Sequence, residues 1–170
     1  MATTTHGTEW EHHAPATGMK GLFYRLVATE ADAGPAIARL VLGLVMFPHG
    51  AQKMLGWFGG HGFAGTMGFF TGPMGLPSAL AALIIVIEFF GSLALILGAL
   101  SRPAALGIAA IMIGAVVTVH ARFGFFMNWY GSAGGEGFEY HLLALALCAV
   151  VILRGGGAWS VDRALSSGRR

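Results

Sequence analysis

ALAALIIVIEFFGSLALILGAL, residues 79–100, is the stretch that decides the fold, an apolar run with a single carboxylate, Glu88, inside it. A helix needs about 20 apolar residues to cross the hydrocarbon core of a bilayer, so this run predicts a membrane span. Glu88 is eleven residues beyond Pro77, or about 16 Å along the helix, which places it near mid-membrane. A charge there costs at least ~2.5–3.5 kcal/mol, so Glu88 is expected to face the bundle interior, either neutral or paired with a cation.

The composition also indicates a membrane protein. Hydrophobic residues make up 55% of the 170-residue chain and charged residues only 11%, against about 25% charged in a soluble domain. Such a chain cannot cover its surface with polar groups, so lipid is its expected solvent. The single cysteine, Cys148, excludes an intrachain disulfide and is predicted to be a small core residue.

Four apolar segments predict four transmembrane helices. They cover about residues 35–55, 77–100, 103–121 and 140–153, and the last needs flanking residues to reach the ~20 of a span. The tight connection SRP at 101–103 makes the second and third helices an antiparallel hairpin. The predicted fold is therefore an all-α integral membrane four-helix bundle, with both termini on the same side.

The distribution of Lys and Arg predicts the orientation. Eight of these residues fall on the side of the termini and the SRP turn, and two, Lys53 and Arg122, on the other side. This asymmetry places both termini in the cytoplasm of a cell with the protein in its inner membrane. The glycine- and aromatic-rich loops 56–76 and 122–139 then face outward. Phe63, Met67 and Phe70 recur at helical spacing, which predicts a short interfacial helix across the outer mouth.

The chain divides into four parts by this reasoning. Residues 1–19 are interpreted as a flexible polar tail and 20–33 as a short amphipathic helix on the membrane surface. Residues 34–165 form the four-helix domain, and 166–170 a basic C-terminal end. The basic residues follow the membrane orientation rather than a groove-shaped patch, so nucleic acid is excluded as a partner.

Polar residues on the first helix can meet Glu88. Arg39, Gly43, Met46, Gly50 and Lys53 share one stripe, and His49 lies beside it. If the first two helices face each other, a polar column Arg39–Glu88–His49–Lys53 is possible. Two interpretations of that column stay open: a catalytic site, or a buried ion pair that sets the register of the helices.

These residues have the chemistry of a quinone site, which needs an apolar slot with a few groups that bind carbonyl oxygens and exchange protons. His49 and Lys53 are the predicted donors and Glu88 the predicted proton carrier. The other predicted cofactor-binding residues are Arg39, Met46, Phe47, Gly50 and His120. The expected cofactor is ubiquinone or menaquinone. No haem, flavin or nucleotide signature occurs in the sequence, so electrons are expected from a partner protein.

A metal site formed by His49, His120 and His141 is conceivable but not favoured. If the stripe Gly107, Gly114 and Thr118 faces inward, His120 points about 140° away from Gly107 at 100° per residue.

Three segments resemble the DoxX family of small bacterial membrane proteins: RLVLGLVMFPHGAQKMLG (39–56), IEFFGSLALILGALSRPAAL (87–106) and GGGAWSVDRAL (155–165). The residues that correspond to the family pattern are Arg39, Gly43, His49, Gly50, Lys53, Glu88, Gly91, Arg102, Ser160 and Asp162. The resemblance covers about residues 35–165. It implies a four-helix membrane fold, and an association with quinone-linked sulfur oxidation or with oxidative-stress complexes at the membrane.

Three functions are compatible with these observations. The favoured one is a quinone-interacting membrane component of a redox system, working with a partner oxidoreductase in the membrane or on its periplasmic side. The alternative is a non-catalytic anchor or assembly subunit that holds a partner through its outer loops. A small transporter or proton pathway through Glu88 has the least support, because four short helices show no obvious repeat. A homo-oligomer is compatible with each.

Overall fold

Helices make up the regular structure of residues 18–167, the part of the chain that the computed structural model describes. The predicted polar tail and the extreme C-terminal end lie largely outside these residues. In order, the helices are α1 (Met19–Val27), α2 (Ala33–Leu55), α3 (Gly62–Thr71), α4 (Ser78–Leu97), α5 (Ser101–Ala115), α6 (Glu139–Arg154) and α7 (Val161–Ser167), with short helical turns η1 (Trp57–Gly59), η2 (Val116–His120) and η3 (Ala121–Phe123). The predicted all-α class is confirmed for this range.

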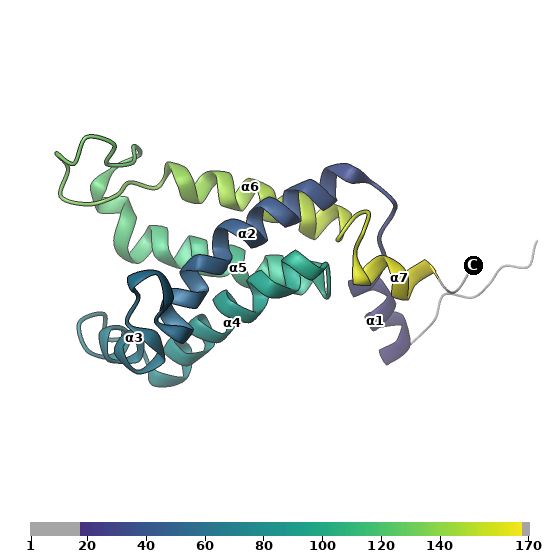
Figure 1. Cartoon of the computed structure of the whole chain (residues 1–170), viewed down its shortest axis with the longest axis horizontal. Coiled ribbons are helices and arrows are strands. Elements are labelled where there is room, and N and C mark those ends of the chain that lie inside the picture. The colour runs from purple at the N-terminus through teal and green to yellow at the C-terminus, as the bar shows by residue number, and fades with distance from the viewer. Residues whose placement is uncertain (1–17, 168–170) are drawn as a thin grey trace, which may run out of the picture.

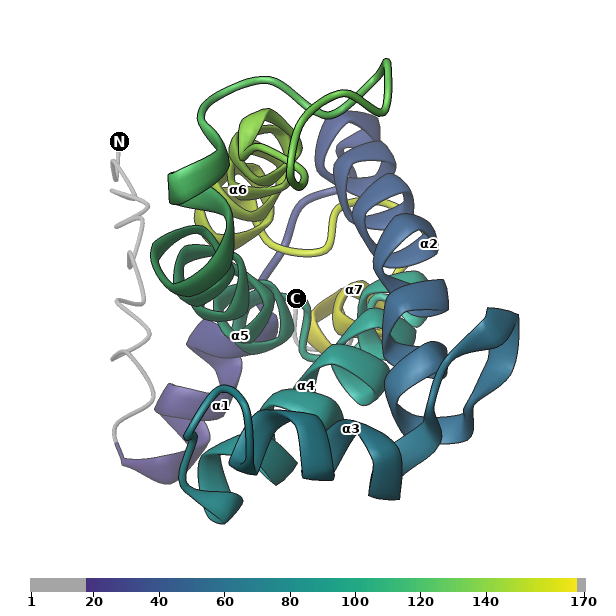
Figure 2. The ribbon, with the colours of Figure 1, turned by 90° about the vertical axis from the view of Figure 1, so that its left-hand side faces the viewer.

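The four longest helices pack side by side in a ring. Each contacts two neighbours, in the order α2–α4–α5–α6 and back to α2. Figure 2 looks along this ring, and Figure 1 shows it from the side. The core between them is apolar and includes Leu42, Met46, Leu95, Ile108 and Cys148. Cys148 is fully buried, so its predicted place in the core is confirmed.

Three helical stretches are long and apolar enough to cross a membrane. They are Ala33–Leu55, Ser78–Leu97 and Ser101–Phe123, the last of which joins α5 to η2 and η3. α6 has 16 residues and so is about 24 Å long, less than the ~30 Å of the hydrocarbon core. The fourth span and the cytoplasmic position of the termini therefore stay predictions.

Short helices lie at the two ends of the ring (Figure 1). α1 and α7 contact each other at one end, the termini end, and α3 lies at the opposite end, the loop end. α1 ends at Val27, earlier than the predicted helix 20–33. Asp32 then caps the start of α2, where its carboxylate accepts a hydrogen bond from the Gly34 N–H. α3 confirms the helix predicted from Phe63, Met67 and Phe70.

Arg39 belongs to the termini end, so the predicted column from Arg39 to Glu88 is wrong. Its side chain is 1% exposed and donates hydrogen bonds to five carbonyl oxygens, those of Leu95, Ile96, Gly156, Ala158 and Trp159. The last carbonyls of a helix lack partners within the helix. Arg39 supplies donors to the end of α4 and to the chain before α7, about 10 Å along α4 from Glu88.

Asp162 of α7 holds the turn between α4 and α5. Its two carboxylate oxygens accept hydrogen bonds from the N–H groups of Leu100 (2.7 Å) and Ser101 (2.8 Å). Ser160 accepts one from the Arg163 N–H and so caps α7. The Ser-x-Asp motif therefore joins the chain after α6 to the α4–α5 hairpin, which is a structural role.

Candidate functional site

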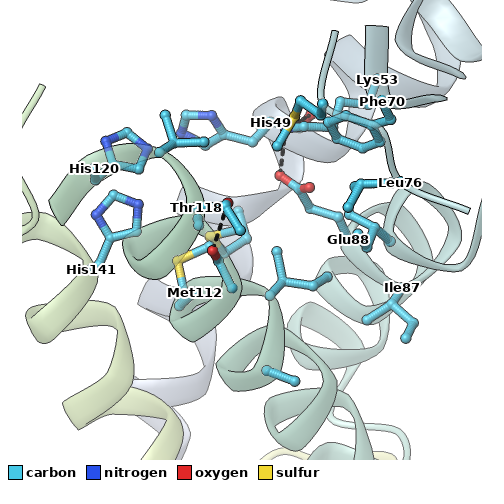
Figure 3. A pocket seen from close by; sticks show the side chains of 18 of the residues that line it. His49, Lys53, Phe70, Leu76, Ile87, Glu88, Met112, Thr118, His120 and His141 are labelled. Atoms are coloured by element: carbon cyan, nitrogen blue, oxygen red, sulfur yellow. Dashed lines mark hydrogen bonds and ion pairs between the residues drawn. The ribbon is translucent and has the colours of Figure 1, made fainter. Parts of the chain in front are cut away.

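A cavity of about 620 Å³ lies among the halves of α2, α4, α5 and α6 nearest the loop end. Side chains of α3 and of the segment between α3 and α4, namely Phe69, Phe70, Met74 and Leu76, close it from that end. Its volume falls within the range of small-molecule sites, about 300–1,000 Å³. Its wall is mostly aliphatic and aromatic, with a small number of polar side chains (Figure 3).

An ion pair forms one polar side of the cavity. Lys53 Nζ of α2 lies 2.8 Å from Glu88 Oε1 of α4. The Glu88 side chain is 4% exposed and that of Lys53 is 27% exposed. Of the two possibilities for Glu88, the structure therefore shows pairing with a cation. Both members line the cavity, so they are accessible to a molecule inside it.

Gly50 allows this pair to form. A Cβ at Gly50 would lie 2.7 Å from the Phe89 Cα and 2.8 Å from the Glu88 carbonyl oxygen, closer than real contacts. The backbones of α2 and α4 are thus nearly touching beside Glu88, which brings Lys53, one turn further on, within reach. Gly50 does not line the cavity. Gly50 packs α2 against α4 and does not make the predicted contact with a cofactor.

Histidines form a second polar region. The rings of His120 and His141 have centroids 4.2 Å apart. His120 Nδ1 donates to the Glu136 carbonyl oxygen at 2.8 Å. His141 is 6% exposed, and its Nδ1 has no hydrogen-bond partner in the described part of the chain. Figure 3 shows these two rings across the cavity from the Lys53–Glu88 pair, with Met112 and Thr118 between.

The π-helical turn η2 corrects the predicted direction of His120. A regular α-helix would turn this side chain away from the stripe of Gly107, Gly114 and Thr118, but His120, Thr118 and Gly114 all line the cavity. Hydrogen bonds in a π-helix span five residues, so each residue rotates by less than 100°. The regular phase of 100° per residue therefore does not apply to His120, which ends this turn and lines the cavity. Within residues 18–167, no three His, Cys, Asp or Glu side chains are grouped as a metal site would require.

The structure thus gathers part of the predicted set. Met46, His49, Lys53, Glu88 and His120 line the cavity, whereas Arg39, Phe47 and Gly50 do not. Phe47 instead packs against Phe89, with ring centroids 5.9 Å apart. Tyr140 and His141 are lining residues that the predicted quinone site omitted. The spacing of Tyr140, Ala144 and Cys148 could have identified the inward face of α6, with His141 beside it.

The arrangement has the features of a site for a small apolar molecule with polar atoms at two ends. One side offers the Lys53 ammonium and the Glu88 carboxylate, and the other the imidazole of His141. His49 and Tyr140 connect the regions, with ring centroids 6.3 Å apart. Each of these groups can donate or accept a hydrogen bond, and His and Glu can also take up or release a proton.

Comparison with known proteins finds similarity to one family and to two of its relatives. The DoxX family model matches residues 34–121. A protein of Bacillus subtilis (strain 168) named "Putative oxidoreductase CatD" is 31% identical over 116 residues, which cover 68% of this chain and 76% of that protein. The "Inner membrane protein YqjF" of Escherichia coli (strain K12) is 30% identical over 135 residues, 79% of this chain and 94% of that protein. No solved structure is significantly similar. The matched segment holds α2, α4 and α5 with Lys53, Glu88 and His120, and the chain belongs to the DoxX family.

Proposed function

We propose that this protein is a membrane-embedded component of a redox system that binds a quinone in the cavity and works with a partner oxidoreductase. The observation that carries this proposal is the apolar cavity with polar groups on two opposite sides, the Lys53–Glu88 pair on one and the His141 imidazole on the other. A quinone ring has this pattern, an apolar body with a carbonyl oxygen at each end.

The residues fit such a ligand. The His141 imidazole lines the cavity and can donate a hydrogen bond to one carbonyl oxygen of the ligand, a bond worth about 0.5–1.5 kcal/mol. On the other side, the ammonium of Lys53 has three N–H groups, and its distances to Glu88 (2.8 Å) and to the His49 carbonyl oxygen (3.4 Å) leave capacity for a further acceptor. Donors on both sides can therefore hold both carbonyl oxygens.

A bound quinone takes up two electrons and two protons when it is reduced to the quinol, and releases them when the quinol is oxidised. In this proposal the partner exchanges the electrons. Glu88 and His141 hold or release the protons beside the two oxygens, and Lys53 stabilises negative charge on the nearer one. His120 packs on His141 and donates to the Glu136 carbonyl oxygen, which holds the two rings together on this side of the cavity.

The finer topology belongs to the same proposal. α6, with its flanking residues, completes a fourth span beside α2 and α5, and the termini lie in the cytoplasm, as the distribution of Lys and Arg requires. The name of the Bacillus subtilis relative, an oxidoreductase, supports the redox role. The name of the Escherichia coli relative, an inner membrane protein, supports the location.

The test is a titration of the purified protein in lipid nanodiscs with ubiquinone and menaquinone. We expect His141→Phe and Glu88→Gln each to weaken binding by about 10- to 100-fold, the equivalent of a charged or buried hydrogen bond of ~1.5–3 kcal/mol. Glu139→Gln is the matched control, because Glu139 lies two residues before His141 but bonds to Met127 and Trp129 in the loop rather than lining the cavity. Unchanged affinity in both site variants, or no binding to the intact protein, would contradict the proposal.

The anchor alternative is favoured by one observation, the aromatic side chains exposed on the loop between η3 and α6. Phe126, Trp129 and Tyr130 are 73%, 77% and 93% exposed. Such residues suit either a partner protein or the membrane interface. If no quinone binds while a partner copurifies in a fixed ratio, and replacement of these three residues by Ser releases it, the anchor function replaces the redox one.

A further inference from the structure

We infer that the cavity admits its ligand sideways from the lipid, between α4 and α5, and that it is built for a quinone with a long apolar tail lying in this opening. The inference rests on the proposed function and adds to it the class of quinone and its route of entry. α4 and α5 separate along their length and leave such an opening.

The two helices touch near the middle of the membrane and part toward the loop end. A Cβ added at Gly107 of α5 would lie 2.7 Å from Ile87 Cγ2 of α4, and one added at Gly91 of α4 would lie 3.7 Å from Ile108 Cδ1 of α5. Two turns further along α5, a Cβ at Gly114 would meet no atom of residues 18–167 within 4 Å. The space beside Gly114 is therefore open.

This opening is continuous with the cavity. Leu80, Leu83, Ile84 and Ile87 recur every three or four residues on α4, and all of them line the cavity. The facing stripe on α5 is Gly107, Ala110 and Gly114. Leu80 and Leu83 are also 43% and 52% exposed. Side chains that border the cavity and the outer surface together mark an entrance between the two helices.

The entrance faces hydrocarbon. Gly114 is 13 residues beyond Ser101, so it lies about 20 Å along a span that must cover ~30 Å. Its borders are mostly Leu, Ile, Ala and Gly, and the Thr118 hydroxyl, one turn beyond Gly114, is bonded to the Gly114 carbonyl oxygen. At the loop end, α3 and the segment after it cover the cavity with Phe and Met side chains. The lateral route is thus the one that suits an apolar molecule.

These features specify the orientation of the ligand. The headgroup binds between Lys53–Glu88 and His141, and the alkyl tail leaves through the opening, where it exchanges contacts with lipid for contacts with Leu80 and Leu83. A tail that follows this path must pass Gly114, because that glycine forms the wall of the opening on α5. A side chain there would occupy the path without displacing packed atoms.

The experiment compares two ligands with the same headgroup, ubiquinone with a long isoprenoid tail and a ubiquinone analogue without the tail, in Gly114→Phe protein in nanodiscs. We expect affinity for the tailed quinone to fall by at least about tenfold, or 1.4 kcal/mol, and affinity for the tail-less one to stay within about twofold. Val117→Phe is the control, because Val117 lies in the same helical stretch, Ser101–Phe123, is 72% exposed and does not line the cavity. Ala110→Phe, at the same opening, is the second variant if Gly114→Phe does not fold.

The affinities of Gly114→Phe for the two quinones test whether the tail lies in this opening. Equal losses for both ligands, or no loss for either, would overturn it while leaving quinone binding in place. Failure of the wild-type protein to bind even the tail-less quinone would overturn the proposed function itself, and the inference with it. If native mass spectrometry shows that Gly114→Phe removes a copurified phospholipid while tailed quinone binds normally, the opening holds an acyl chain and the inference is wrong.

Discussion

Replacing Lys53 by Met tests how strongly the ion pair with Glu88 contributes to the fold. The substitution keeps most of the side-chain length and removes the cation that lies 2.8 Å from the Glu88 carboxylate. Glu88 stays buried on α4 with no other cation in a salt bridge with it among residues 18–167. The substitution therefore leaves an unpaired acid inside an apolar bundle, and it does not create a void.

The expected cost follows from the burial of the two partners. Removing one member of a fully buried pair costs about 3–5 kcal/mol. Glu88 is 4% exposed, but Lys53 is 27% exposed, so water reaches the cationic side. We therefore expect Lys53→Met to lower the free energy of unfolding by about 2–3 kcal/mol, a decrease in Tm of about 4–12 °C for a chain of this size. Adding Glu88→Gln to Lys53→Met should restore about half or more of the lost free energy of unfolding, because a neutral amide needs no cation.

The single cysteine provides the assay. Cys148 is fully buried in the folded protein and reacts with a thiol reagent when the bundle unfolds. The labelled fraction, measured by mass spectrometry along a denaturant series in detergent, therefore gives the free energy of unfolding of each variant. The control is Arg154→Met, which removes the cation of the surface pair with Asp32, 3.2 Å apart with side chains 60% and 41% exposed. That pair should be worth only about 0–1 kcal/mol.

Two results would refute this reasoning. If Lys53→Met costs no more than Arg154→Met, the pair with Glu88 behaves like a surface ion pair and Glu88 is not sheltered. If Glu88→Gln does not restore stability to Lys53→Met, the loss comes from something other than an unpaired carboxylate.

Three further predictions use the same thiol assay. Gly50→Ala should lower the free energy of unfolding by about 1–3 kcal/mol, since its Cβ would lie 2.7 Å from the backbone of α4, whereas Gly114→Ala, with no atom in range, should be neutral or stabilising by up to about 1 kcal/mol. Asp162→Asn should lower the free energy of unfolding by about 1–3 kcal/mol, because two backbone N–H groups at the α4–α5 turn lose a charged acceptor. A change near zero would show that α7 does not stabilise the hairpin. Arg39→Lys should cost at least about 2 kcal/mol, because one ammonium cannot satisfy the five carbonyl oxygens that the guanidinium reaches; folded protein of wild-type stability would contradict that role.

Local composition was sufficient for several features of the fold. The apolar runs bounded by proline and glycine predicted α2, α4 and the hairpin after it, because hydrocarbon accepts only segments whose backbone hydrogen bonds are internal. Helical spacing in the loop predicted α3. The depth of Glu88 predicted a sheltered carboxyl group that is either neutral or paired with a cation, and the stripe on α2 contained Lys53.

The assignment of partners could not be read from the same patterns. Arg39 and Lys53 share a stripe, but Arg39 is next to the carbonyls at the end of α4 and only Lys53 reaches Glu88. His120 was predicted to bind the cofactor although a regular helix with Gly107 and Gly114 inward would turn it away, and the π-helical turn at 116–120, which breaks that phase, has no signature in its residues, VVTVH. The closeness of His120 to His141 depends on that turn and on the contact of α5 with α6.

By itself, the sequence determined that the chain is helical, that it belongs in a membrane, and that a carboxylate inside it must be sheltered. Those conclusions depend on transfer of side chains from water to lipid, a property of each segment taken alone. The tertiary structure decided which cation shelters Glu88, that the rings of His120 and His141 lie together, and that α4 and α5 part beside Gly114. These depend on distances of a few ångströms between helices, which are set by where glycines allow backbones to touch and not by the polarity of any one segment.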